Sequence, residues 1–177
     1  AILYYDIVGY QQKKALKRMF KLIIKILFGL CFILNPSQAS ASAFYPKDHI
    51  VIDLSKNIEW LRCSVGQRWT GDSCNGEALL MNHEVIAQAI IIANEQLGPA
   101  WRLPTLDELF SLVCKKCSKG KKFDQIIFPN TDPRAYWTGE KNSMSKGSYW
   151  TVNFFTGHKF GRFYPEQEMA VRLVRDR

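Results

Sequence analysis

Five lysines fall within eight residues of the chain, and two cysteines flank the first two of them. The lysines are Lys115, Lys116, Lys119, Lys121 and Lys122, and the cysteines are Cys114 and Cys117. A disulfide-constrained loop loses little entropy on binding, and each contact between an ammonium group and a polyanion releases counterions. The pattern therefore predicts a site for an anionic polymer, to which Arg134, Lys146 and Arg162 would add if the fold brings them near. The alternative is that the lysines are solvated surface.

The cysteines allow a second kind of chemistry. Beyond residue 43 the chain holds Cys63, Cys74, Cys114 and Cys117. An even count in an exported chain favours disulfides. Four cysteines allow three connectivities, and we choose the one that joins sequence neighbours, Cys63 with Cys74 and Cys114 with Cys117. A zinc site is the alternative, although Cys63 and Cys74 are spaced too widely for the usual close pair. The Cys114–Cys117 spacing also matches a redox pair, but such pairs sit at a helix N-terminus, and this one follows a predicted helix.

Other residues that could do chemistry have weaker contexts. Residues 71–74 resemble the nucleophile segment of trypsin-like proteases, but Ser73 has no recognisable base. His49, His83 and His158 lack metal-ligand spacing, and we expect each at the surface or in a turn. Residues 150–153 lack the oxygen ligands of a calcium-bridged sugar site. Neither a metal nor a cofactor is predicted. Of the five tryptophans, at most one or two are expected to face a ligand.

The elements that must position these residues are two helices and several strands. Strands are predicted over residues 50–53 and 57–63, followed by a polar loop over 63–76. One helix runs from a cap at Asn82 to residue 97, with Val85, Ile86, Ala89, Ile90, Ala93 and Leu97 as its buried stripe. A second begins with Pro104, Thr105 and Glu108, a capping-box arrangement, and ends near residue 113. Strands follow over 136–138, 148–155, 158–163 and 171–175, which together describe an α+β domain.

The first 43 residues read as a leader. We interpret residues 1–18 as an upstream extension and residues 19–43 as a signal peptide, with a basic start, an apolar stretch and small residues before the cleavage site. The apolar stretch is too short for a membrane-spanning helix, so no permanent span is expected after cleavage. Residues 44–177 then form one domain with 18 Lys/Arg and 15 Asp/Glu. That small net charge argues against nucleic-acid binding.

Several segments together resemble a known family. Residues 60–67 with Trp69 and Cys74, residues 101–109, 136–138, 150–154 with Gly157, and 171–175 occur in the same order in the Lcl (legionella collagen-like) C-terminal domain of bacterial exported proteins. The resemblance implies a C-type-lectin-like fold, in which two helices pack on a small antiparallel meander and disulfides staple the loops. It also implies an adhesin that recognises sulfated glycosaminoglycans. The chain has no collagen-like Gly-x-y stalk.

The sequence is compatible with three functions. The first is a non-enzymatic exported module, periplasmic or at the cell surface, that binds acidic polysaccharide. The second is a structural or assembly subunit of a surface organelle or secretion apparatus, whose partner is another envelope protein or a second copy of the chain. The third is an enzyme of the formylglycine-generating type, which needs a reactive cysteine pair in a cleft.

Overall fold

The computed structural model describes residues 17, 19, 21 and 43–177 of the 177-residue chain. The predicted upstream extension (residues 1–18) and, apart from its last residue, the predicted signal peptide (residues 19–43) lie outside its continuously described part. Within the described residues, no helix combines the length and the apolar character needed to span a bilayer. The described residues from 43 onward belong to one compact unit that ends at Arg177.

A four-stranded antiparallel sheet joins the two ends of this unit. Its strands are β1 (Phe44–Lys47), β2 (Ile50–Asp53), β3 (Ile58–Leu61) and β9 (Val174–Asp176), in the spatial order β1-β2-β3-β9. The register aligns Phe44 with Asp53, Asp53 with Ile58, and Ile58 with Asp176. One row of paired residues therefore crosses all four strands, from the start of β1 to the end of β9.

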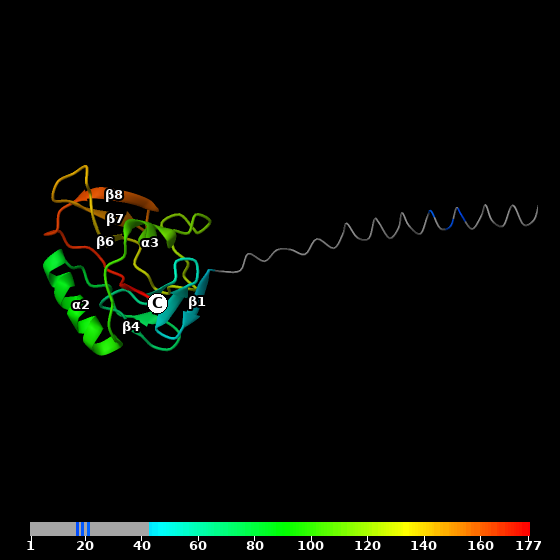
Figure 1. The fold of residues 1–177 in the computed structure, drawn as a ribbon, viewed down its shortest axis with the longest axis horizontal. Coiled ribbons are helices and arrows are strands. Elements are labelled where there is room, and N and C mark those ends of the chain that lie inside the picture. Colours follow the sequence, from blue (N-terminus) through cyan, green and yellow to red (C-terminus); the bar gives the residue numbers. More distant parts are fainter. Residues whose placement is uncertain (1–16, 18, 20, 22–42) are drawn as a thin grey trace, which may run out of the picture. The chain divides into compact units, whose positions relative to one another are not determined.

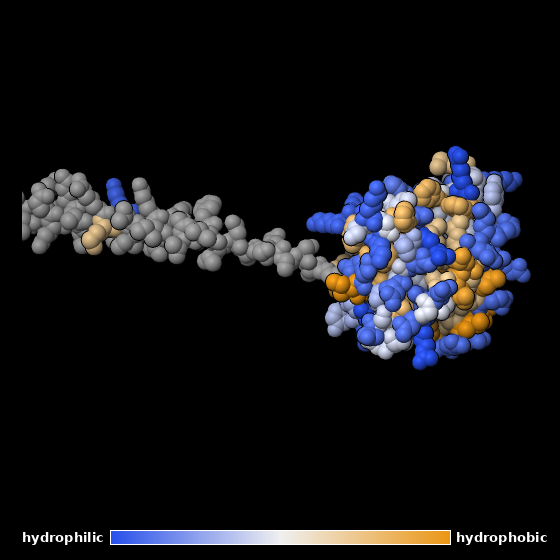
Figure 2. All heavy atoms as spheres, turned by 180° about the vertical axis from the view of Figure 1, so that it is seen from behind, coloured by the Kyte–Doolittle hydropathy of each residue, from blue (hydrophilic) through white to orange (hydrophobic). Residues whose placement is uncertain are grey.

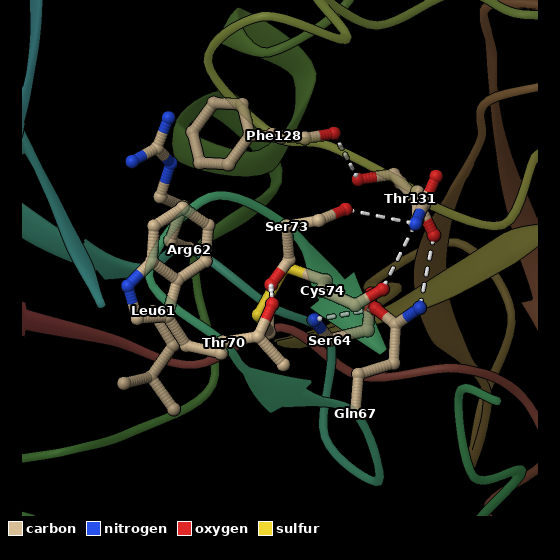
Figure 3. The surroundings of a disulfide bond; sticks show 12 residues. Leu61, Arg62, Ser64, Gln67, Thr70, Ser73, Cys74, Phe128 and Thr131 are labelled. Carbon is tan, nitrogen blue, oxygen red and sulfur yellow. Dashed lines mark hydrogen bonds between the residues drawn. A yellow bond between two sulfur atoms is a disulfide. The ribbon is translucent and has the colours of Figure 1, made fainter. Parts of the chain in front are cut away.

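A short hairpin follows β3 and is stapled to it. It consists of β4 (Arg68–Trp69) and β5 (Cys74–Asn75), and the Cys63–Cys74 disulfide ties it to the end of β3 with a Cα–Cα distance of 5.5 Å. Gln67 lies beside this disulfide, where its side chain accepts from the amide of Ser64 and donates to the carbonyl of Asn130 (Figure 3). The polar loop predicted over residues 63–76 is thus an ordered, cross-linked element.

Two helices follow, and both begin where their capping residues predict. In α2 (His83–Leu97) the side chain of Asn82 accepts from the amide of Val85, and Gly98 at φ 90° ends the helix. In α3 (Leu106–Ser111) Thr105 and Glu108 form a complete capping box. Arg102 donates to both carboxylate oxygens of Glu108 and to Asp176, which connects α3 to β9.

A three-stranded antiparallel meander completes the fold. It consists of β6 (Ala135–Lys141), β7 (Tyr149–Asn153) and β8 (His158–Phe163), in that spatial order. Figure 1 shows α3 lying against this sheet and α2 on the other side of the domain. The described chain is therefore α+β, with two helices, small antiparallel sheets and two disulfides, as the sequence predicts.

Two apolar clusters form the core. One gathers Trp60, Leu109, Tyr136 and Phe154 between the four-stranded sheet, α3 and the meander. The other lies under α2 and contains Ile86, Met81, Trp101, Trp137 and Leu173. Trp60, Trp101 and Trp137 are buried, whereas Trp69 and Trp150 are only partly covered. That at most one or two tryptophans face a ligand stays a prediction.

The structure corrects three local predictions. Val85 and Leu97 are 48% and 40% exposed, because the buried side of α2 is narrower than the stripe assigned to it. Figure 2 shows apolar side chains grouped at the edge of the domain where α2 runs.

The second correction concerns the last strand, which begins at Val174 rather than at residue 171. The carbonyl of Val171 accepts from the amide of Val65, which lies beyond the end of β3, so residue 171 is not paired with that strand.

The third correction concerns His83, which was expected at the surface or in a turn. Its ring packs against Trp137 and Tyr149, with centroid distances of 4.7 Å and 4.0 Å. His83 is the first residue of α2, directly after the cap at Asn82, and is partly buried. Burial lowers the pKa of His83, and the charge of Glu166 opposes that shift only in part.

Candidate functional site

The Lys-rich loop over residues 114–122 is held in shape by its own backbone and by the meander. The Cys114–Cys117 disulfide closes its first turn, with a Cα–Cα distance of 5.3 Å. The amide of Cys114 donates to the carbonyl of Lys122 at 3.0 Å, which joins the two ends of the loop. The amide of Lys122 donates in turn to Phe154 at 2.7 Å, just beyond the end of β7. The loop is therefore anchored at the covalent bridge and at the sheet.

Four of the five lysines are free to meet a ligand. Lys115, Lys116, Lys119 and Lys121 are exposed, and the structure shows no ion pair to any of them among the described residues. Lys122 differs, because its side chain is half-buried and its ammonium group donates to the carbonyl of Cys117 at 2.9 Å. Lys122 thus holds the loop together, and the other four carry uncompensated charge.

An exposed aromatic side chain borders this loop. Phe155 is 58% exposed, and a Cβ placed on Gly120 would lie 3.2 Å from its ring. The nearby Lys159 is already engaged, since its ammonium group pairs with Asp107 at 3.1 Å and lies over the ring of Phe110. Phe155 was not among the predicted site residues. Phe154 and Phe155 follow directly after β7, and the first is buried whereas the second is exposed.

The other three predicted site residues are not gathered around the loop as free cations. Arg134 pairs with Asp132 at 2.6 Å, and the hydrogen bond from this carboxylate raises the pKa of Arg134. Lys146 and Arg162 are exposed near the opposite end of β7, where Tyr149 pairs with Phe163, whereas the loop meets the sheet beyond Asn153. The two ends of β7 lie roughly 13 Å apart, so the two groups are placed at opposite ends of this strand.

The structure offers little support for the redox, serine-nucleophile and metal chemistries. All four cysteines of the described domain form the two predicted disulfides, Cys63–Cys74 and Cys114–Cys117. Ser73 accepts a hydrogen bond from Asn130 at 3.0 Å, in a network that holds β5 in place. No cluster of His, Cys, Asp and Glu suited to a metal ion occurs within the described part of the chain.

Three further arginines make their side-chain contacts within the domain. Arg102 pairs with Glu108, and Arg175 pairs with Glu59 at 2.7 Å. Burial acts to raise the pKa of Glu108, but hydrogen bonds from Arg102 and Thr105 outweigh it and hold that pKa below its usual range. Arg172 is fully buried, and its guanidinium lies over the ring of Phe128. These three side chains stabilise the fold.

Comparison with known proteins places these features in a family context. The family model described as the Lcl C-terminal domain matches residues 49–175, which include both disulfides, both helices and the Lys-rich loop. No curated protein and no solved structure matches the chain.

Proposed function

The chain belongs to the Lcl C-terminal domain family, and from this premise we propose that it is an exported, non-enzymatic module that binds acidic polysaccharide through residues 114–122. The observation that carries the proposal is the state of the four exposed lysines. They stand on a loop closed by a disulfide and by two backbone hydrogen bonds, with no carboxylate paired to them in the described structure. Such a loop keeps its charges in place before the ligand arrives.

Sulfated or uronic-acid polysaccharide is the ligand class that we propose. Its repeated anionic groups match a cluster of exposed ammonium groups, and its sugar rings offer apolar faces to an aromatic side chain such as Phe155. The association of the family with exported proteins supports a place outside the cytoplasm, in the periplasm or at the cell surface. Four cysteines held as disulfides fit an oxidising compartment.

We further propose that the domain is C-type-lectin-like. Three features support this proposal: the first and last strands share one sheet, two helices flank the sheets, and long connections are cross-linked by disulfides. A lectin-like scaffold without a calcium site would leave ligand binding to a loop, which is the role proposed for residues 114–122.

The test is retention on heparin by two variants with equal loss of charge. In the first, Lys115, Lys119 and Lys121 are replaced by Gln. In the control, Lys47, Lys56 and Lys141 are replaced by Gln, which removes three exposed lysines from β1, the β2–β3 turn and β6. The loop variant is expected to elute at clearly lower salt, and the slope of log K against log[salt] should fall by roughly two to three. The control variant should elute close to the wild type.

Equal shifts for the two variants would contradict the proposal, since they would show that heparin senses only net charge. The same experiment separates the polysaccharide-binding role from an assembly role. An assembly subunit would use the exposed side chains of α2, such as Ile91 and Ile92, and would lose no more heparin retention from the loop than from the control.

A further inference from the structure

A pocket of about 420 Å³ lies on a different part of the domain, between the stapled segment 63–69 and the C-terminal half of α2. Its floor is aliphatic, with Leu61, Val65, Ala89, Ala93 and Leu173 among the lining residues. A concave, mostly apolar site of this volume is of the size that holds small molecules or a single large side chain. It shares no residue with the Lys-rich loop, so a ligand in this pocket would bind independently of the polysaccharide proposed above.

One wall of the pocket is a tryptophan that is fixed before any ligand binds. The indole N–H of Trp69 donates to the carboxylate of Asp48 at 2.7 Å. The guanidinium of Arg62 lies 4.2 Å from the centre of the same ring, and Arg62 is itself held by the carbonyls of Ile126 and Ile127. Trp69 also belongs to the hairpin that the Cys63–Cys74 disulfide staples. Because Trp69 is already held in place, a ligand that packs against it loses little binding free energy to ordering this side chain.

The polar groups around the pocket divide into those already bonded and those still available. The side chain of Gln67 bonds to Ser64, Gly76 and Asn130, so it has no role left for a ligand. Arg68 and Gln96 line the pocket, are exposed, and have no side-chain bond in the described structure. No Asp or Glu lines the pocket. His49 also lines the pocket, but its ring bonds to Asp48, whose carboxylate lies just outside the lining and accepts from Trp69. A free cation and a free amide thus stand at the edge of a largely apolar cavity with no carboxylate in its lining.

From this arrangement we propose that the pocket binds an apolar group that carries a single carboxylate, with Arg68 as the counter-charge and Trp69 as the stacking wall. A guanidinium binds the two oxygens of a carboxylate side by side, which gives both strength and direction. A dianionic phosphate would call for more than one free cation, and the aliphatic floor gains nothing from a polar body. The ligand is either a small aryl or alkyl acid or the C-terminal residue of a peptide, which present the same chemistry.

The test compares an acid with its uncharged amide on the full-length chain. The first arm uses 3-phenylpropionate and 3-phenylpropionamide. The second uses a four-residue peptide ending in phenylalanine, with a free or an amidated C-terminus. Dissociation constants come from NMR titration, in which the side-chain N–H resonance of Trp69 reports contact with the pocket. The acid is expected to bind about tenfold more tightly than the amide in at least one arm.

Two variants and a control locate the interaction. Arg68→Gln is expected to weaken the acid to the level of the amide and to leave the amide unchanged, because only the counter-charge is lost. Ala89→Leu fills the floor and should weaken both ligands. Lys56→Gln removes a distant exposed charge and should change neither.

Four results would overturn the proposal: no binding in either arm, equal affinity for acid and amide, insensitivity to Arg68→Gln, or insensitivity to Ala89→Leu. Binding of the peptide acid together with the small acid would identify a chain terminus as an accepted source. Binding of the small acid alone would restrict the ligand to free acids, and both of these outcomes support the site.

Discussion

The buried guanidinium of Arg172 shows how one side chain joins distant segments of this domain. It donates to the backbone carbonyls of Leu61 and Arg62 and to the hydroxyls of Ser64 and Thr131. Burial lowers the pKa of Arg172 to about 10, so the group stays charged at neutral pH. The alternating pattern near the C-terminus placed Arg172 in a strand, but no local signal showed that its partners lie more than 40 residues away.

At the residue scale, His83 should make the stability of the domain depend on pH. Its pKa is lowered in the folded state, so as the pH falls the unfolded chain takes up the proton first. Stability therefore remains intact above the unfolded-state pKa of about 6.5 and is lost as the pH falls from there toward the folded-state pKa. We expect His83→Gln to remove this part of the pH dependence.

Urea unfolding between pH 7.5 and pH 5 measures this effect. His158→Gln is the matched control, because His158 is exposed at the start of β8 and should leave the pH profile unchanged. A His83→Gln profile that runs parallel to that of the wild type would show that the histidine does not titrate in this window.

At the scale of elements, the sequence predicts the helix starts and strands that depend on residues close together in the chain. The caps at Asn82 and Thr105 lie where the sequence indicates, and the predicted strands over 50–53 and 158–163 coincide with β2 and β8. Strand β1 was missed, because its partner β2 rather than its own composition makes it a strand. The grouping of the Lys-rich loop was visible in the sequence, but the separate placement of Lys146 and Arg162 depends on the length of β7.

The capping box of α3 gives a prediction at this scale. Thr105→Ala leaves the amide of Glu108 without its acceptor at the start of a six-residue helix. The loss should cost about 1 kcal/mol of unfolding free energy. Thr105→Ser retains the hydroxyl, and chemical denaturation should show it close to the wild type. If the serine and alanine variants lost the same amount, the methyl group and not the cap would be the stabilising part.

For the whole molecule, the two disulfides should contribute unequally to stability. Cys63–Cys74 closes a loop with a sequence separation of 11, and Cys114–Cys117 closes one with a separation of 3. Loop-closure entropy then predicts a loss of about 3 kcal/mol for the paired Cys63→Ser and Cys74→Ser variant, and of about 2 kcal/mol for the paired Cys114→Ser and Cys117→Ser variant.

Denaturant unfolding of the two double variants, with the oxidised wild type beside them, measures both losses. The second variant should also bind heparin less tightly at a given salt concentration, since its lysines lose the rigid frame. A larger loss of stability from the Cys114–Cys117 pair than from the Cys63–Cys74 pair would contradict the loop-entropy explanation.

The row of the four-stranded sheet that aligns Phe44, Asp53, Ile58 and Asp176 has a practical consequence. Three strand-to-strand steps of about 4.8 Å separate the start of β1 from the end of β9. A host protein can therefore accept this domain as an insertion into a single surface turn, because entry and exit need only a narrow gap. The same proximity lets a short glycine linker join the two ends and move the chain break to another turn, as in a circular permutant.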